Sequence, residues 1–380
     1  MRQAGSGVLL LVVVVLVLAI VVPSSTAASG DLKNHGGPVV RAGDVYVIFW
    51  LPPGRHFDPR SSDASFESFV RRGVASLGGS SWWATLSQYG ARNGLEFGGS
   101  WVDSTPYPHA GTSGAPLRSA DFRAPVERAL AANGWRPGLD RIYLVITAND
   151  TEACGLDTLV GSGLSVWKNA QPCTLPVSSS NACAGHSFFS IQGRQVLYAI
   201  LPESSNRGCT PDPSQSPNHD IRADEAITVG AALLAETAVD PLGTGWYVRS
   251  APVGLLCNID SPVPLHLHSD VYALLGLHSN AQHACVHGYP PLGLSASLSS
   301  PTARAGARDT LTVTTAPGAG LYLHFGNGGG TRDFAATADA HGLFRYSWLV
   351  RAQPRQGFIT VTATRNGRSG SSTVHFQVAA

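Results

Sequence analysis

The sequence predicts two domains, an α/β or α+β domain over residues 30–291 and an all-β sandwich over residues 292–380. Before residue 291, apolar runs rich in β-branched and aromatic residues alternate with segments whose apolar residues recur at helical spacing. After it there are no cysteines, and short alternating runs are separated by turns that contain Gly and Asn. This change of pattern indicates a mixed domain followed by a sandwich.

Three buried strands are expected in the first domain, at residues 44–51, 141–149 and 195–202. Each is a short apolar run rich in Val, Ile, Tyr or Phe. Such runs are typical of strands that are covered on both faces.

Three helices are expected between and after these strands, at residues 65–77, 121–133 and 224–240. In each, the apolar residues fall on one face at a spacing of three and four. Asp224 is the expected cap of the third helix, which stops before Pro241.

The second domain shows the regular succession of short strands that is typical of a sandwich. Turn residues separate the runs, among them Asn366-Gly367. The five strands are expected at residues 310–316, 320–326, 342–351, 357–365 and 372–379.

The first 28 residues have the form of a signal peptide. Arg2 precedes an apolar run over residues 8–22, and small residues follow up to Ala27 and Ala28. The run is shorter than the ~20 residues that a membrane span needs. We therefore expect cleavage, a secreted protein in the extracellular space or at the cell surface, and no membrane span after cleavage. An uncleaved membrane anchor is the alternative.

Charge argues against nucleic-acid and anionic-membrane partners. The formal net charge is +1, charged residues make up 13% of the chain, and no basic run stands out. Binding to phosphate groups needs clustered Lys and Arg. No nucleic-acid partner is expected.

The chain has 6 cysteines, all in the first domain. An even number of cysteines in an exported protein predicts disulfides. Three bridges are expected, with the pairing left open, among Cys154, Cys173, Cys183, Cys209, Cys257 and Cys285.

Residues 30–291 resemble the EXORDIUM, or phosphate-induced-protein, family of secreted plant proteins and their bacterial relatives. The resemblance rests on several short motifs in the same order along the chain. They are NHGGPVV at 34–40, SWW at 81–83 with Tyr89, LVITANDTEACG at 144–155, CAGHS at 183–187, and LLAETAVDPLGTGWY at 233–247 followed by Cys257.

The resemblance implies an extracellular or cell-wall protein with no settled catalytic activity. Some bacterial relatives carry His-Glu-x-x-Glu on the third helix and look like zincins, which implies a zincin-like fold for the first domain. The unit TADAHGLFRYSW at 337–348 resembles bacterial immunoglobulin-like modules, which implies an immunoglobulin-like sandwich for the second.

The third helix departs from the zincin-like pattern at Ala232 and Leu233, which stand where the His and the Glu would be. An alanine cannot bind a metal, and a leucine cannot take a proton from water. We therefore expect no zincin chemistry at this helix and no cofactor.

Zinc remains the alternative, on a rebuilt site. Histidines and carboxylates are the ligands that such a site would use. The candidate ligands are His186, Glu236, Asp240, His266 and His268, the last two expected on one face of a strand. The competing interpretation is that these are hydrogen-bonded structural residues.

The leading functional hypothesis is a non-catalytic protein that binds a cell-wall or extracellular polymer and is displayed on an immunoglobulin-like module. Aromatic residues such as Trp82 and Trp83 are candidates for a sugar-stacking surface, with core packing as the alternative. Two other functions stay open: a divergent secreted metallohydrolase with a rebuilt metal site, and a purely structural surface protein.

Overall fold

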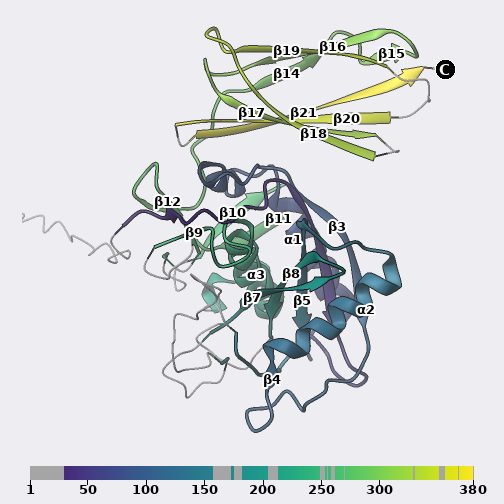
Figure 1. Cartoon of the computed structure of the whole chain (residues 1–380), viewed down its shortest axis with the longest axis vertical. Helices are drawn as coiled ribbons and strands as arrows, with labels where there is room; N and C mark the ends of the chain where they lie inside the picture. The colour runs from purple at the N-terminus through teal and green to yellow at the C-terminus, as the bar shows by residue number, and fades with distance from the viewer. Residues whose placement is uncertain are drawn as a thin grey trace, which may run out of the picture.

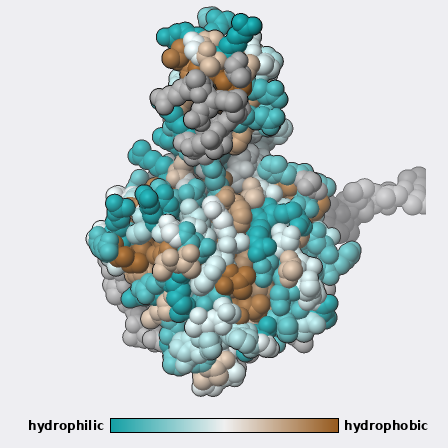
Figure 2. All heavy atoms as spheres, turned by 90° about the vertical axis from the view of Figure 1, so that its right-hand side faces the viewer, coloured by the Kyte–Doolittle hydropathy of each residue, from teal (hydrophilic) through white to brown (hydrophobic). Residues whose placement is uncertain are grey.

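The computed structural model forms an α/β lobe at one end of the molecule and a β-sandwich at the other (Figure 1). Figure 2 shows the sandwich as a narrow lobe above the broader α/β lobe. The predicted signal peptide and Cys209 lie outside the described residues. Those residues are 30–156, 173–174, 182–203, 213–248, 253–254, 256–257, 262–268, 270–327, 330–350, 356–366 and 368–379.

A five-stranded sheet forms the centre of the first lobe. Its order is β3-β2-β5-β8-β7, in which the first four strands are parallel and the edge strand β7 is antiparallel to β8. The three predicted strands are its inner members. The bounds are β2 (Gly43–Trp50), β3 (Leu95–Asp103), β5 (Gly138–Thr147), β7 (Gly185–Ile191) and β8 (Arg194–Leu201).

Helices cover both faces of this sheet. Alternate residues of β2 point to opposite sides, so that Val47 and Phe49 pack with helices α1 and α3 while Ile48 and Trp50 pack with α2. The result is a three-layer α/β/α arrangement with two apolar cores. The bounds are α1 (Asp63–Leu77), α2 (Arg123–Asn133) and α3 (Ile221–Val239).

Helix α3 begins earlier than the sequence pattern indicated. Its cap is Asp220, whose carboxylate accepts a hydrogen bond from the Ala223 N–H at 3.0 Å, and the prediction of Asp224 as the cap is wrong. Asp224 instead lies buried in the first turn and accepts hydrogen bonds from Ser216 and Asn218. The helix ends at Val239, before Pro241, as expected.

Short elements complete the first lobe. The paired strands are β1 (Lys33–Asn34) with β9 (Trp246–Tyr247), β4 (Leu117–Arg118) with β6 (Ala153–Cys154), β10 (Val263–Leu267) with β11 (Asp270–Leu274), and β12 (Leu277–Ser279) with β13 (Ala284–Val286). The 3-10 helices are η1 (Trp83–Tyr89), η2 (Ser119–Phe122) and η3 (Pro213–Gln215).

Disulfides join Cys154 to Cys173 and Cys257 to Cys285. Cys183 is also disulfide-bonded, so no cysteine within the described ranges is free. Stable disulfides are rare in the reducing cytosol. Within the same ranges, no helix combines the length and the apolar character that crossing a membrane requires.

The second lobe is the expected all-β sandwich. A three-stranded sheet, β14-β16-β19, packs on a five-stranded sheet, β15-β21-β20-β17-β18, around an apolar core. The strands are β14 (Ser295–Leu298), β15 (Thr302–Arg304), β16 (Arg308–Thr314), β17 (Gly320–Asn327), β18 (Gly330–Thr337), β19 (Leu343–Leu349), β20 (Gln356–Arg365) and β21 (Arg368–Ala379).

The sequence pattern missed β14, β15 and β18. The first two are only 4 and 3 residues long, too short to show an alternation. Strand β18 carries Arg332 and Asp333 and lies at the edge of its sheet, where both charges remain close to water. Its outer position explains why it lacks the apolar alternation of its neighbour β17.

Candidate functional site

The structure brings together three of the five predicted metal ligands and separates the other two. His186 on β7 lies against Glu236 of α3 and Asp240, which caps the end of that helix. His266 and His268 lie at the far end of strand β10 and line a cleft beside the sandwich. The predicted pairing of these two histidines on one strand face is wrong, because β10 ends at Leu267 and His268 occupies a turn at a φ of 55°.

The buried cluster of His186, Glu236 and Asp240 is held between β7 and α3. His186 Nε2 lies 2.9 Å from the backbone oxygen of Asp240, which can only accept a hydrogen bond. Nε2 therefore carries the proton, and Nδ1 keeps a lone pair. That Nδ1 lies 3.7 Å from Glu236 Oε1, too far for a hydrogen bond, and neither atom has another partner within the described ranges.

Burial disfavours the charged form of all three groups. It lowers the pKa of His186 to about 4, and the hydrogen bond to Asp240 opposes the shift only in part. Burial, and secondly the charge of Asp240, raise the pKa of Glu236 well above its usual value. Burial also raises the pKa of Asp240 to about 6, against hydrogen bonds from two backbone N–H groups. At neutral pH His186 is therefore a neutral imidazole, and burial favours the protonated form of the Glu236 carboxyl group that it faces.

The helix positions of the zincin-like motif are covered by protein. Ala232 and Leu233 are buried. Gly254 lies directly over Ala232, since a Cβ placed on Gly254 would be 3.5 Å from that of Ala232. Protein therefore covers the helix position at which a metal-binding histidine would stand.

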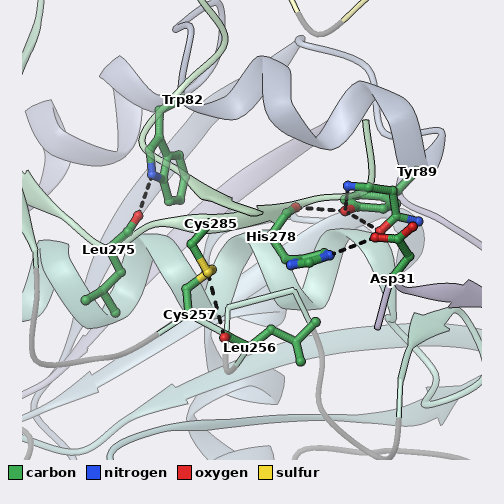
Figure 3. Close-up of a disulfide and its surroundings, with 9 residues drawn as sticks. Asp31, Trp82, Tyr89, Leu256, Cys257, Leu275, His278 and Cys285 are labelled. Atoms are coloured by element: carbon green, nitrogen blue, oxygen red, sulfur yellow. Dashed lines mark hydrogen bonds and ion pairs between the residues drawn. A yellow bond between two sulfur atoms is a disulfide. The ribbon is translucent and has the colours of Figure 1, made fainter. Parts of the chain in front are cut away.

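The segment around Gly254, which covers Ala232, is held in place by several contacts (Figure 3). The Cys257–Cys285 disulfide ties it to β13, and the His278 N–H donates a hydrogen bond to the Val253 oxygen. Strand β12 is held in turn by Tyr89, which donates to the His278 oxygen at 2.7 Å. Cys257 and Tyr89 belong to the motifs of the family resemblance, and here they and Cys285 hold this segment in place over α3.

The aromatic pair at 82–83 lies in the core. Trp82 and Trp83 are 0% and 1% exposed, and the Trp82 Nε1–H donates to the Leu275 oxygen at 2.7 Å (Figure 3). Of the two interpretations, core packing is therefore the one that the structure supports for these residues.

An open cleft of about 630 Å³ lies between the two lobes. The α/β lobe contributes the end of α1, residues 93–97, His266 and His268, and the sandwich contributes its five-stranded sheet. This volume falls in the usual range for a ligand site.

The sandwich face of the cleft is polar because strand residues alternate between the two sides of a sheet. On β17 and β20, Leu323 and Val361 point into the core, while their neighbours His324 and Thr360 point outward. Strand register then builds a polar row across the sheet, running through Asp333, His324, Thr360 and Thr373. Phe358 adds an aromatic ring to the same face.

His324 also joins the lobes. Its Nδ1 lies 2.6 Å from Asp333 Oδ1 on the neighbouring strand and 2.9 Å from Glu96 Oε1 on β3. Burial alone would lower the pKa of His324, but the two carboxylates outweigh it and raise that pKa to about 9. Beside it, Tyr322 packs on Gly94 and under the Arg92 guanidinium.

Sequence reasoning missed the residues of this junction and a buried carboxyl at the edge of the sheet. Glu203 follows β8, is 1% exposed and has no hydrogen-bond partner for either carboxyl oxygen in the described part of the chain. The position of Glu203 could have indicated a site, because ligand sites of open α/β sheets lie at the carboxyl ends of parallel strands. Glu96 and Asp333 gave no such signal, because the strands that bear them were not predicted.

No family model and no curated protein matches this chain. Solved structures with partial similarity include Spo0M, a sporulation control protein from Bacillus subtilis, at 12% identity over 24% of this chain, with a TM-score of 0.17. The match spans 50% of Spo0M. A CARDB domain from Pyrococcus furiosus, in complex with di-metal ions, matches at 12% identity over 24% of this chain and 94% of its own length, also with a TM-score of 0.17. An engineered protein matches over 88% of this chain and 86% of its own, at 12% identity and a TM-score of 0.20. Similarity at this level identifies neither fold nor function.

Proposed function

We propose that this chain is an exported, non-catalytic protein of the EXORDIUM type that binds an extracellular polysaccharide in the cleft between its two lobes. The observation that supports this function best is the contrast between two sites. The α3 site is sealed at Ala232 and Leu233, whereas the interlobe cleft is open and lined with hydroxyl, imidazole and aromatic groups.

The chemistry of the cleft favours a sugar polymer. A sugar ring offers apolar C–H faces and a rim of hydroxyl groups, so its site needs aromatic surfaces beside short polar side chains. The cleft supplies Phe358 and Phe97 together with Thr360, Thr373 and Ser81. Being open at the surface, it suits a segment of a long chain.

The fold supports the family proposal. The sheet ends in one antiparallel edge strand, β7, and α3 follows β8 and packs against both of these strands. This arrangement is in keeping with the α/β first domain that the resemblance implies. The sandwich, with sheets of three and five strands, is in keeping with an immunoglobulin-like module.

Export is supported by the disulfides of the first lobe and by the leader-like sequence of residues 1–28. Nothing in the charge of the cleft favours a nucleic acid, since Glu96 and Asp333 lie in or beside it. The expected partner is therefore a neutral or weakly charged extracellular polymer.

The alternative, a hydrolase rebuilt on His186, Glu236 and Asp240, has weaker support. The imidazole and the carboxyl group are there, but they are 1% and 4% exposed and lie beneath packed protein. A substrate would reach them only if the protein that buries them moved away.

A glycan array probed with the full chain, secreted with its own leader, tests the proposal. Retention on one class of polysaccharide, with no release of sugar or peptide fragments, is the expected result. Absence of binding to every polymer would favour the purely structural function. Chelator-sensitive turnover of a peptide or ester would favour the hydrolase.

A further inference from the structure

We propose that Glu96, His324 and Asp333 form a binding site for a first-row divalent cation of the Zn²⁺ or Mn²⁺ type, which bridges the two lobes at the edge of the cleft. The inference goes beyond polymer binding and does not depend on what occupies the cleft.

The three ligand atoms already converge. Within the described ranges, they are the one group of three His, Cys or carboxylate side chains whose ligand atoms all lie within 4.8 Å of one another. The distances from His324 Nδ1 are 2.6 Å to Asp333 and 2.9 Å to Glu96. Ligand atoms bound at about 2.0–2.2 Å to one metal ion lie about 3.0–3.4 Å apart, so these atoms would have to separate by several tenths of an ångström to admit the ion.

The charges of the cluster are unbalanced without a cation. Nδ1 of His324 bears a single proton and faces two carboxylate oxygens, so one proton must serve two acceptors. Even an imidazolium leaves one negative charge uncompensated on the two carboxylates, whose side chains are 35% (Glu96) and 30% (Asp333) exposed. A divalent cation bound by a neutral imidazole and two carboxylates balances the charge completely.

A buried hydroxyl lies beside the cluster. Tyr322 is 6% exposed, and its hydroxyl group lies within reach of the Asp333 carboxylate. The Arg92 guanidinium lies over the Tyr322 ring, 5.7 Å from its centre, and does not occupy the site.

The ligand set indicates the class of metal. One imidazole with two carboxylates suits Zn²⁺ and Mn²⁺. Ca²⁺ needs six to eight oxygen ligands, about twice what this site provides, and prefers no imidazole. Since Glu96 belongs to the α/β lobe and the other two ligands to the sandwich, the bound ion would fix the lobes and hence the width of the cleft.

The test is a titration of the chelator-treated full chain with Zn²⁺ at pH 7.5, without polymer, together with metal analysis after dialysis. The parent chain is expected to bind one equivalent of Zn²⁺, and Ca²⁺ should not compete. Glu96→Gln and Asp333→Asn should each weaken binding by at least about tenfold. His341→Ala, which removes an exposed histidine of the sandwich, should leave it unchanged.

The two ligand variants keep the shape of the side chain and lie in different lobes, so a folding defect in one, visible by circular dichroism, leaves the other informative. Zn²⁺ should also raise the unfolding temperature of the parent chain but not of the variants. No binding by the parent chain would overturn the site. So would binding that both variants retain. Neither result would bear on polymer binding.

Discussion

His186 and Glu236 face each other across 3.7 Å of buried space, an imidazole nitrogen toward a carboxyl oxygen, with no hydrogen bond between them. Burial favours the uncharged form of both groups, because they lie out of contact with water. A neutral acid and a neutral base in the core cost less than an ion pair held at too great a distance. We therefore interpret this cluster as structural.

Replacing Glu236 by Gln should stabilise the protein more and more as the pH rises. The raised pKa means that the folded state keeps a proton that the unfolded state loses above its ordinary value of 4.5. The parent chain should then lose about 1.4 kcal/mol of unfolding free energy per pH unit until the folded pKa is reached. Glu236→Gln does not titrate, so its advantage should be small at pH 4 and large at pH 8.

Urea unfolding at these two pH values measures the effect. The contribution of His186, which has the opposite sign and is lost as the pH falls below 6.5, is present in both proteins and cancels to a first approximation. Glu127→Gln, at an exposed position of α2, is the control and should show no trend. A pH-independent difference for Glu236→Gln would mean that the carboxyl is already ionised in the folded state.

A histidine at position 232, where the zincin-like motif has one, should destabilise the folded protein. Ala232→His places an imidazole where Gly254 packs, and overpacking of this kind costs about 1–3 kcal/mol. Ala131→His, at an exposed position of α2, should lower the free energy of unfolding by little more than the difference in helix propensity between alanine and histidine. Chemical unfolding of both variants makes the comparison. Equal stability of the two would mean that the space above α3 is open after all.

The inner strands of the sheet and all three helices could be predicted from the sequence, whereas the edge strands could not. Strands β2, β5 and β8 are covered on both faces and therefore read as continuous apolar runs. Strand β3 contains Gly98, which packs against the ring of Tyr46 and leaves no room for a side chain. Its glycines and charged ends conceal the alternation on which the prediction depends.

The presence or absence of a local sequence pattern also explains which residues of the candidate sites could be predicted from the sequence. His186, Glu236 and Asp240 lie within recognisable motifs on one helix and the adjoining strand, so their meeting follows from local structure. Glu96 and His324 are 228 residues apart by their numbers, in different lobes. Their contact is decided by how the lobes pack, which no local pattern records.

Adding a methyl group at the junction should push the lobes apart. A Cβ on Gly94 would lie 2.2 Å from the Tyr322 ring, so Gly94→Ala must displace either the ring or the sandwich. Small-angle scattering should show a larger radius of gyration than in the parent chain. Gly114→Ala, where a Cβ meets nothing within 4 Å, is the control. An unchanged radius for Gly94→Ala, with a folded protein, would argue against a fixed junction.

Removing the Cys257–Cys285 disulfide should destabilise the first lobe. The bridge closes a loop with a sequence separation of 28, for which the loss of chain entropy corresponds to about 3.6 kcal/mol. The double variant Cys257→Ser and Cys285→Ser should unfold at lower urea concentration. It should also expose the segment over α3 to limited proteolysis near residue 254. Equal resistance of parent and variant would mean that the other contacts suffice to hold the segment.

The central claim is that the open cleft, and not the sealed helix, is where this protein acts. The most direct test is retention on the polysaccharide found by the array, comparing Phe358→Ala with Phe344→Ala. Both remove a half-buried phenylalanine from the sandwich, but Phe358 lines the cleft and Phe344 lies on the other sheet. We predict that Phe358→Ala weakens retention at least tenfold, a loss of about 1.4 kcal/mol or more, while Phe344→Ala binds like the parent chain. Equal binding by all three proteins would contradict the account.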